Sequence, residues 1–305
     1  MNILITGGTG FIGRALTAEL LNRGHTITVL TRNTTKARRR LPKACEVITT
    51  LADYQPSPAI DAIVNLAGEP IANARWTPAR KQRLRDSRLG VTQDILAFIA
   101  RSEKKPGVLV SGSAVGYYGD QRDLPVKEDS EPHTDFSHLL CRDWEQAALG
   151  AEALGVRVAL VRTGLVIGHS GFLARMLPAF RLGLGGRLGD GQQYMPWIHL
   201  DDEVGLICEL IFNEHARGAF NATAPHPVTN QAFTRCLGLV LNRPTWFSVP
   251  AALLRFALGE LSQLLLTGQR ALPARATHEL YYAYRYPELE TALRETLAKR
   301  HSRQN

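Results

Sequence analysis

The N-terminal segment constrains the fold more than any other stretch of the chain. Residues 2–6 (NILIT) predict a short buried strand, and the pattern FIGRALTAELLNRG that follows predicts a helix ended by Gly24. Between them, Gly7 permits a tight turn, Gly10 lets a bound pyrophosphate approach the backbone, and Gly13 lets helix pack on strand. A strand that enters a helix in this way is the first unit of an open α/β sheet.

The start of this helix predicts a phosphate site. Phe11 and Ile12 open the helix, where backbone N–H groups have no partner inside it. These groups and the positive end of the helix dipole attract phosphate oxygens. A glycine triplet is a weak signal on its own, but its place directly after a strand favours a dinucleotide site over a merely tight turn.

The end of the second strand indicates which dinucleotide is bound. Residues 26–31 predict this strand, which ends in Thr31 and Arg32 with no Asp or Glu nearby to bind the adenosine ribose. An arginine fork matches the oxygens of a 2′-phosphate. Thr31 and Arg32 therefore favour NADP(H) over NAD(H), the alternative being an exposed arginine without a role.

Strand and helix patterns alternate along the first half of the chain. Apolar strands are predicted at 45–49, 59–68, 107–113 and 156–164, with a long basic helix at 77–101. Strands that are apolar on both faces indicate an α/β fold, a Rossmann-type doubly wound parallel sheet. We expect the dinucleotide-binding domain over residues 1–168, with parts of 200–228 completing it. Residues 169–305 then form a smaller, mostly helical substrate-side region, with a short C-terminal helical domain from about residue 249.

Charge and cysteine usage disfavour several classes of function. The 305 residues carry a formal net charge of +8, with basic clusters at 36–40 and 80–88. No aromatic-interleaved or zinc-finger pattern accompanies them, so we expect a solvated face or an anionic small ligand and no nucleic-acid partner. The cysteines form no CxxC pair and no metal-ligand spacing with His, which predicts no metal and reduced thiols. They are Cys45, Cys141, Cys208 and Cys236.

A membrane partner is not expected either. The longest apolar stretch, residues 249–266, is interrupted by Arg255 and Glu260, which predicts an amphipathic helix and not a span. The N-terminus lacks the features of a signal peptide, so we expect a cytoplasmic protein. Its expected partner is a small-molecule substrate, and oligomer formation stays open.

Three motifs carry a family resemblance. TGGTGFIG, NLAGE and VSGSAVGYYGD resemble the extended short-chain dehydrogenase/reductases of the NAD-dependent epimerase/dehydratase family. NLAGEPI, RLGLGGRLGDGQQYMPWIHLDD and LLLTGQRALP resemble, more narrowly, its atypical YfcH-like subfamily over nearly the whole chain. The resemblance implies further cofactor contacts beside the adenine ribose, beneath the cofactor and along the nicotinamide. These are, in that order, Leu66, Ala67 and Gly68, then Arg88, then Val166.

The resemblance also implies a catalytic triplet that is incomplete here. The family uses a Tyr and a Lys four residues later, together with a Ser or Thr after the fifth strand. Ser113 matches the last of these, but Ser137 and Cys141 stand where the Tyr and Lys belong. A serine does not ionise near neutral pH and a cysteine lacks the ammonium charge, so ordinary chemistry by that pair is not expected.

Substitutes for the missing pair are available nearby. Tyr117 and Tyr118 follow Ser113 where substrate should lie, although packing with a solvent-wetted hydroxyl is the alternative role. Arg142 and His199 could supply charge or a proton. The alternative for Arg142 is an exposed or salt-bridged side chain, and the alternative for His199 is a hydrogen bond in the seam between domains.

The glycine-rich loop GRLGDGQQYMPWIH offers side chains for a polar, anionic or cyclic substrate, unless it is plain flexible surface. These are Arg187, Gln193 and Trp197. Asp201 and Asp202, which follow this loop, are explained by N-capping of the next helix more simply than by catalysis.

Two hypotheses of different class remain. The first is an NADP(H)-dependent oxidoreductase or sugar-nucleotide-type epimerase of unidentified substrate with a relocated acid, Tyr117 or Tyr118. The second is a non-catalytic NADP(H)-binding sensor or scaffold.

Overall fold

A seven-stranded sheet forms the centre of the computed structural model, which describes residues 1–301, the last three by their secondary structure alone. All neighbouring strands are parallel, in the order β12-β7-β5-β4-β1-β2-β3. The order reverses between β1 and β4, where a Rossmann sheet leaves a crevice beyond its carboxyl ends. The predicted fold class is therefore confirmed. The strands are β1 (Asn2–Thr6), β2 (Thr26–Leu30), β3 (Glu46–Ile48), β4 (Ala62–Asn65), β5 (Val108–Ala114), β7 (Arg157–Thr163) and β12 (Gly218–Ala222).

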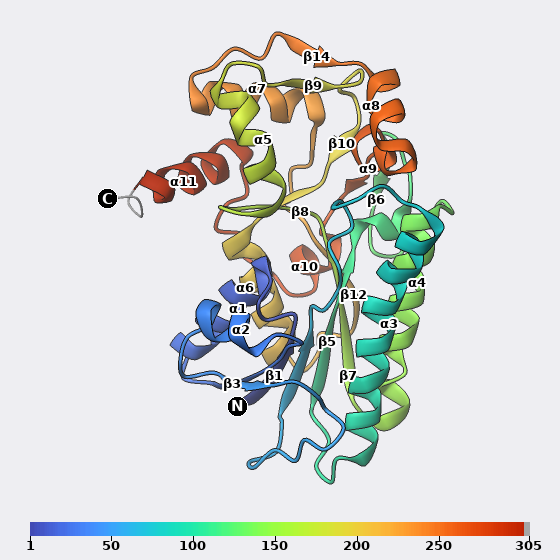
Figure 1. The fold of residues 1–305 in the computed structure, drawn as a ribbon, viewed down its shortest axis with the longest axis vertical. Coiled ribbons are helices and arrows are strands. Elements are labelled where there is room, and N and C mark those ends of the chain that lie inside the picture. The colour runs from blue at the N-terminus through green and yellow to red at the C-terminus, as the bar shows by residue number, and fades with distance from the viewer. Residues whose placement is uncertain (302–305) are drawn as a thin grey trace.

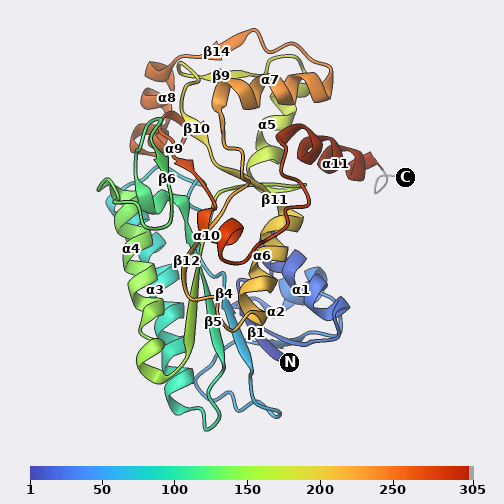
Figure 2. The ribbon, with the colours of Figure 1, turned by 180° about the vertical axis from the view of Figure 1, so that it is seen from behind.

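Helices cover both faces of this sheet (Figures 1 and 2). Successive side chains of a strand point to opposite faces, so Ile3 and Ile5 pack into one core cluster and Leu4 into another. The first cluster includes side chains of α1 (Phe11–Asn22), α2 (Thr34–Arg40) and α6 (Leu200–Phe212). The second includes side chains of α3 (Pro78–Arg101) and α4 (Phe136–Leu149).

A smaller part, which we call the upper lobe, lies beyond the carboxyl end of the sheet (Figure 1). The paired strands β8 (Leu165–Ile167) and β11 (Trp197–His199) lead into and out of it. Its helices are α5 (Gly171–Arg181), α7 (Asn230–Leu241), α8 (Ala251–Leu258) and α9 (Gln263–Leu266), with the 3₁₀ turn η3 (Gly259–Ser262) between the last two. Its strand pairs are β9 (Gly186–Leu188) with β14 (Phe247–Val249), and β10 (Tyr194–Met195) with β13 (Val228–Thr229).

The apolar stretch at 249–266 is not one helix. Gly259 and the 3₁₀ turn η3 separate α8 from α9, so the amphipathic pattern is divided between two short helices. Across the described residues, no helix combines the length and the apolar character needed to cross a membrane.

The C-terminal segment departs from the expected division into two regions. β15 (Arg270–Ala271) pairs with β6 (Pro125–Val126), and α10 (Ala274–His278) lies against β12 at the sheet edge. The Arg275 Nη1 donates to the Ala219 carbonyl oxygen at 2.8 Å. Only α11 (Leu289–His301) returns to the upper lobe, where it packs against α7. The last third of the chain thus bridges both parts.

Asp202 fixes this segment to the start of α6. Its two carboxylate oxygens accept the backbone N–H groups of Arg285 at 2.7 Å and Tyr286 at 3.0 Å. The expected N-capping by Asp201 and Asp202 is wrong, because the cap is His199, whose Nδ1 accepts the Asp201 N–H at 3.1 Å. The His199 ring also lies 4.1 Å from the Tyr286 ring, which places it in the seam between the sheet and the C-terminal segment.

Candidate functional site

The glycine turn after β1 has no space for side chains. A Cβ on Gly7, which has a φ of +69°, would collide with the Leu66 carbonyl group, and one on Gly13 would collide with the Gly7 carbonyl oxygen. The Gly10 N–H donates to the Gly7 oxygen at 2.9 Å and closes the turn. The backbone is thereby open to a ligand from the crevice side, as the glycine spacing predicts.

The N-terminus of α1 is free to bind an anion. Gly10 occupies the cap position, no side chain accepts from the first amides, and the first turn holds no acidic residue. The N–H groups around Phe11 and Ile12 and the helix dipole therefore retain their attraction for phosphate. The Phe11 ring reaches toward the upper lobe, where it lies against Gly168 and Gly171.

A basic surface follows β2. The Arg32 side chain is exposed, and Thr31 continues the ladder by donating its N–H to the Ile48 oxygen at 2.9 Å. A shallow groove beside Arg32 is lined by Asn33, Thr35, Lys36, Arg39 and Arg40. No carboxylate lines it, so this edge suits a phosphate better than a pair of ribose hydroxyls.

The turn after β4 lies against the glycine loop. Leu66 continues the ladder by donating its N–H to the Thr6 oxygen at 3.2 Å, and its carbonyl group abuts Gly7. The Arg88 guanidinium lies under Gly68 and donates to the carbonyl oxygens of Glu69 and Leu84 at 3.2 and 2.9 Å. Burial lowers the pKa of Arg88. This arginine supports the turn from beneath.

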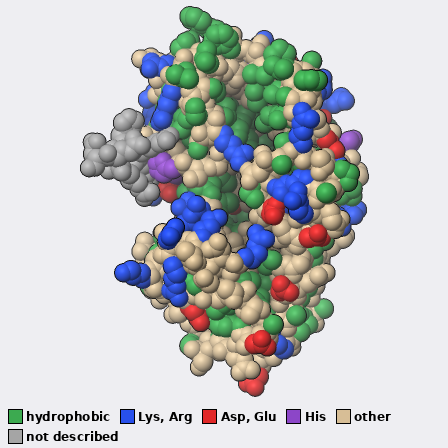
Figure 3. All heavy atoms as spheres, viewed as in Figure 1, with side chains coloured by type: hydrophobic (Ala, Val, Ile, Leu, Met, Phe, Trp, Pro, Cys, Tyr) green, Lys and Arg blue, Asp and Glu red, His purple; other side chains and the backbone are tan. Residues whose placement is uncertain are grey.

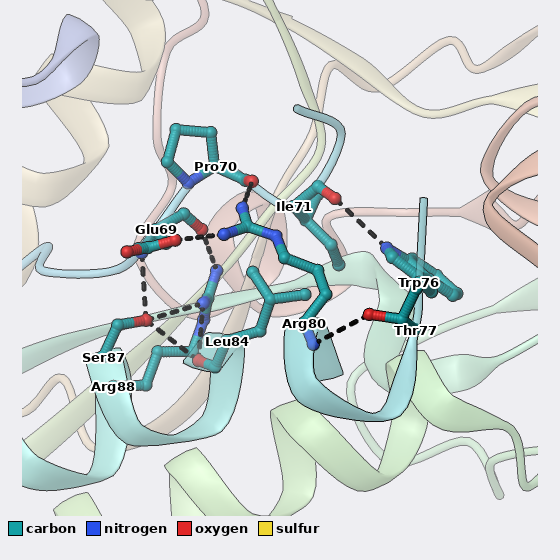
Figure 4. Close-up of polar contacts among 9 residues, drawn as sticks. All are labelled: Glu69, Pro70, Ile71, Trp76, Thr77, Arg80, Leu84, Ser87 and Arg88. Atoms are coloured by element: carbon teal, nitrogen blue, oxygen red, sulfur yellow. Dashed lines mark hydrogen bonds and ion pairs between the residues drawn. The ribbon is translucent and has the colours of Figure 1, made fainter. Parts of the chain in front are cut away.

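The basic cluster at 80–88 is not the solvated face that its charge suggested. Arg80 is buried, pairs with Glu69 and donates to the Pro70 oxygen at 2.7 Å (Figure 4). The Glu69 N–H in turn donates to the Ser87 hydroxyl at 3.0 Å. The helix therefore uses its arginines to hold the loop after β4, because those carbonyl oxygens have no strand partner.

A buried network occupies the region beyond β5 and β7. Arg162 of β7 and Glu145 of α4 form a two-point pair, with Nε–Oε1 and Nη2–Oε2 distances of 2.9 Å. Burial acts to lower the pKa of Arg162, but the hydrogen bonds and charge of Glu145 outweigh it and raise this pKa. Arg162 therefore stays charged inside the protein.

Two of the expected catalytic residues belong to this network. The Ser113 hydroxyl donates to Glu145 Oε1 at 2.6 Å. The Tyr118 hydroxyl donates to Asn221 Oδ1 at 2.8 Å, accepts from Arg162 Nη1 at 2.9 Å, and is 0% exposed. Burial raises the pKa of Tyr118 to about 12. Both hydrogen-bonding directions of the Tyr118 hydroxyl are used inside the protein, so Tyr118 fits neither the expected role of a relocated acid nor the alternative of a solvent-wetted hydroxyl.

The positions of the family's Tyr and Lys are also closed. Ser137 and Cys141 are buried and lie against Gly116. Burial and the charge of Glu145 raise the pKa of Cys141 to about 12. The thiol stays protonated at neutral pH, so a catalytic thiolate at this position is excluded.

Tyr117 is the remaining tyrosine candidate. It lies in the 3₁₀ turn η1 (Val115–Tyr118) directly beyond β5 and is partly exposed. The Arg162 guanidinium is centred 3.5 Å from the centroid of its ring, which fixes the ring's orientation. Within the described chain no hydrogen bond engages the Tyr117 hydroxyl. Arg142, in contrast, is paired with Asp143 at 2.8 Å on the surface.

The residues expected to bind substrate are not all in reach of one. Trp197 is fully buried in the upper-lobe core and donates its indole N–H to the His226 oxygen at 3.1 Å, so the expected substrate contact is wrong. Gln193 donates its amide N–H groups to the Leu188 and Leu265 oxygens at 3.0 and 2.7 Å. Arg187 on β9 is exposed and stays a candidate. Figure 3 shows a hollow between the upper lobe and the sheet, with Lys and Arg side chains around it.

Val166, expected beside the nicotinamide, is the middle residue of β8 and pairs with Ile198. Its side chain packs into the core cluster under α6. Among the described side chains, no group of three or more His, Cys, Asp or Glu is placed to hold a metal ion.

Glu203 is a buried carboxyl that the sequence did not reveal. Its Oε1 accepts from the Thr163 hydroxyl at 2.8 Å at the end of β7, and its Oε2 has no hydrogen-bond partner in the described structure. Burial raises its pKa to about 8, against the hydrogen bond from Thr163. A neutral, protonated carboxyl therefore lies under the candidate site at pH 7.

Some signals for the network were present in the sequence. Arg162 interrupts an otherwise apolar strand, and Glu145 follows Cys141 by one helical turn. Each is a charge at a position that the patterns place in the core, where charges must be paired. That they pair with each other follows only from the packing of α4 against β7.

Arg162→Met is predicted to lower the free energy of unfolding by about 3–5 kcal/mol, because it leaves Glu145 charged and unpaired in the interior. Adding Glu145→Leu should recover part of this loss, since the double variant buries no lone charge. Urea denaturation of both single variants and the double variant measures the coupling. Arg294→Met, which removes an exposed ion pair with Glu290 on α11, is the control and should cost less than about 0.5 kcal/mol. Additive losses would contradict the prediction.

Glu203→Gln is predicted to flatten the pH dependence of stability. Between pH 4.5 and about 8 the native Glu203 holds a proton that the unfolded chain releases, so stability falls as pH rises through this window. The Gln variant should lose that slope and be more stable by a few kcal/mol near pH 8. Urea denaturation at several pH values measures the free energy of unfolding. Other buried carboxyls such as Asp202 and Glu128 are present in both proteins, so their contributions cancel in the comparison. Parallel slopes in the variant and wild type would refute it, and exposed Glu214→Gln is the control.

Comparison with known proteins agrees with this geometry. A model of the NAD dependent epimerase/dehydratase family matches residues 3–222, and a domain of unknown function, DUF1731, matches residues 249–296. The Arabidopsis thaliana "Epimerase family protein SDR39U1 homolog, chloroplastic" is 42% identical over 301 residues, covering 96% of this chain and 86% of the relative. The Bacillus subtilis epimerase family protein YfhF is 36% identical, covering 98% and 99%.

Solved structures agree as well. The human epimerase family protein SDR39U1, solved with NADPH, superposes with a TM-score of 0.88 at 35% identity and covers 98% of this chain and 99% of its own. The UDP-glucose 4-epimerase of Thermotoga maritima, solved with UDP-glucose, shares the fold at a TM-score of 0.80 and 18% identity, with full coverage of both chains. On these grounds the chain belongs to the NAD dependent epimerase/dehydratase family, in the atypical group of short-chain dehydrogenase/reductases that ends in a DUF1731 domain.

Proposed function

We propose that this protein binds NADP(H) and uses it to oxidise, reduce or epimerise a small-molecule substrate. The observation that carries the proposal is the turn after β1, where Gly7 and Gly13 leave no space for a Cβ and α1 begins without a side-chain cap. These features fit a pyrophosphate. The exposed Arg32 and the basic groove beside it fit a 2′-phosphate. The NADPH bound to the human relative supports the same assignment.

Tyr117 is our candidate for the relocated acid. It lies beyond the carboxyl end of β5, where the family places its reacting groups, and its hydroxyl is not engaged by the buried network. When bound, the nicotinamide accepts or supplies the hydride. The Tyr117 hydroxyl would then donate or take up the accompanying proton at the substrate oxygen. Arg162 positions the ring, and Ser113 acts through Glu145 to hold the network in place.

On the substrate side, Arg187 suits an anionic group such as the diphosphate of a sugar nucleotide. It is exposed on β9, and no carboxylate among the described residues pairs with it. Gln193 contributes indirectly, since its amide holds the loop after β9 against α9, through the Leu265 oxygen.

One observation favours a second candidate, a non-catalytic NADP(H)-binding sensor or scaffold. The family's Tyr and Lys positions are Ser137 and Cys141, and the hydroxyls of Ser113 and Tyr118 are used internally. These features are expected of a protein that still binds the cofactor but has lost the groups that transfer protons. Turnover of a substrate decides between the two.

The cytoplasmic location expected from the sequence stays a prediction. All four cysteines are free thiols, which suits a reducing compartment. The plant relative is named as chloroplastic.

Arg32→Ser is predicted to weaken NADPH binding by about ten- to a hundred-fold, because one charge-assisted contact to the 2′-phosphate is lost. NADH binding should change by less than about threefold, since NADH lacks that phosphate. Nicotinamide fluorescence titrations with both cofactors measure the effect. Arg38→Ser, an equal loss of charge on α2 outside the groove, is the control. A parallel loss for NADPH and NADH would show that Arg32 does not read the phosphate.

Tyr117→Phe is predicted to reduce kcat/KM by about 10²–10⁴-fold while NADPH affinity stays within about threefold. The assay combines a panel of carbonyl compounds and sugar nucleotides, read by nicotinamide absorbance and by chromatography of the products. Tyr281→Phe, an exposed tyrosine outside the site, is the matched control. If NADPH binds and no compound turns over, the sensor or scaffold is favoured. If a compound turns over and the Tyr117 variant is fully active, the acid is another group.

A further inference from the structure

The outward end of the upper lobe exposes most of the large apolar side chains on the surface. Of the eleven that the described residues leave exposed, seven lie here, and we call them the apolar end. Trp246 is 90% exposed and Phe256 is 84% exposed, more than any other aromatic side chain in these elements. The full set is Leu182, Leu184, Leu239, Trp246, Phe247, Leu253 and Phe256. Such a concentration marks an interaction surface and not scattered surface residues.

The segments that carry these side chains lie side by side. β14 pairs with β9, which places Phe247 opposite Gly186. The Arg243 Nε donates to the Arg181 carbonyl oxygen at 2.9 Å and joins the end of α7 to the end of α5. α8 follows β14 directly and has no buried residue. Figure 3 shows hydrophobic side chains gathered over this end of the molecule, with Lys and Arg side chains beside them.

The two segments that build the apolar end carry charge of one sign, and the carboxylates Asp190 and Glu260 directly follow them. These segments, 171–189 and 227–259, contain no Asp, Glu or Lys. They contain six arginines, none of which forms an ion pair with a carboxylate in the described structure. These are Arg175, Arg181, Arg235, Arg243, Arg255 and Arg187, the last of which the proposed function assigns to the substrate. Apart from Arg175 and Arg243, which donate to neighbouring loops, their guanidinium groups have no hydrogen-bond partner among the described residues.

We propose that the apolar end binds the surface of an anionic lipid bilayer. Trp and Phe side chains on an otherwise folded surface insert at the boundary between headgroups and acyl chains. Arginines beside them are attracted to anionic headgroups, and a short helix such as α8 lies in the plane of that boundary. The apolar end is complementary to such a surface in two ways. Its exposed aromatic side chains match the apolar boundary, and its guanidinium groups match the negative charge of the headgroups.

A second copy of the chain fits this face less well. A two-fold interface brings the same patch against itself, so the guanidinium groups of one copy would meet those of the other with no carboxylate to pair with. The inference also departs from the expected absence of a membrane partner. That expectation concerns spanning segments, whereas the apolar end would lie on a bilayer without crossing it.

The test is co-sedimentation of the full chain with vesicles of phosphatidylcholine alone and with vesicles that contain a third of phosphatidylglycerol. We expect binding to the anionic vesicles that weakens with added salt, and little binding to the neutral ones. Trp76, Trp144 and Trp197 are buried, so a blue shift of tryptophan emission on binding reports Trp246. Trp246→Ser/Phe256→Ser removes the two aromatic side chains that would insert into the bilayer, and should weaken partitioning by at least about tenfold.

Matched variants separate this surface from general stickiness and charge. Leu124→Ser/Tyr281→Ser removes two exposed apolar side chains elsewhere and should bind as wild type. Arg235→Gln/Arg255→Gln should weaken binding to anionic vesicles more than Arg83→Gln/Arg217→Gln, which removes the same charge from other faces. NADPH binding by every variant confirms that it is folded.

Three results would overturn the proposal. The first is sedimentation with neither vesicle, which would leave the patch to a protein partner with acidic groups. The second is equal loss of binding in the matched variants. The third is a dimer in light scattering that Trp246→Ser/Phe256→Ser dissociates, which would assign the apolar end to contact between two copies.

Discussion

The ion pair between Arg162 and Glu145 is the interaction on which the site depends. Both groups are buried, and a buried charge is tolerated only where its partner and the remaining hydrogen-bonding atoms are satisfied. Arg162 also donates to Tyr118 and to the Glu128 carbonyl oxygen, and Glu145 accepts from Ser113. One pair thereby fixes the end of β5, the end of β7 and one face of α4. Only polar groups of these elements that are not hydrogen-bonded to this pair can interact with a substrate.

This constraint separates the two halves of the site. The cofactor half is built from backbone, so it depends on the absence of side chains at Gly7 and Gly13 and on the start of α1. The chemical half is built from side chains, and most of its hydroxyl and carboxyl groups are already hydrogen-bonded to one another. Tyr117 lies on the boundary, because its ring belongs to the network through Arg162 while its hydroxyl does not.

The path of the C-terminal segment explains why the outward face of the upper lobe is uncovered. Asp202 and the β6–β15 pair draw residues 270–286 back to the sheet, so this segment covers the edge strand β12 and not the upper lobe. Only α11 returns to pack on α7. The outward faces of β14 and α8 are left without a covering element, and the apolar end follows from that.

The sequence by itself determined the features that depend on local backbone geometry. These features are the strand, glycine turn and helix at residues 2–22, the parallel sheet, and the basic end of β2. They can be predicted because backbone angle φ, the periodicity of apolar residues and local charge depend on residues close together in the chain. Tertiary structure decided whatever depends on a partner distant in the chain. Trp197 and Tyr118 are residue types common in binding sites, yet each packs in the core, where its polar atom is hydrogen-bonded. The basic cluster at 80–88 predicted a solvated face, but Arg80 and Arg88 donate to carbonyl oxygens of the loop after β4. The type of a residue determines which hydrogen bonds and ion pairs its side chain can form. Whether those bonds are made inside the protein or remain available to a ligand depends on how distant segments pack.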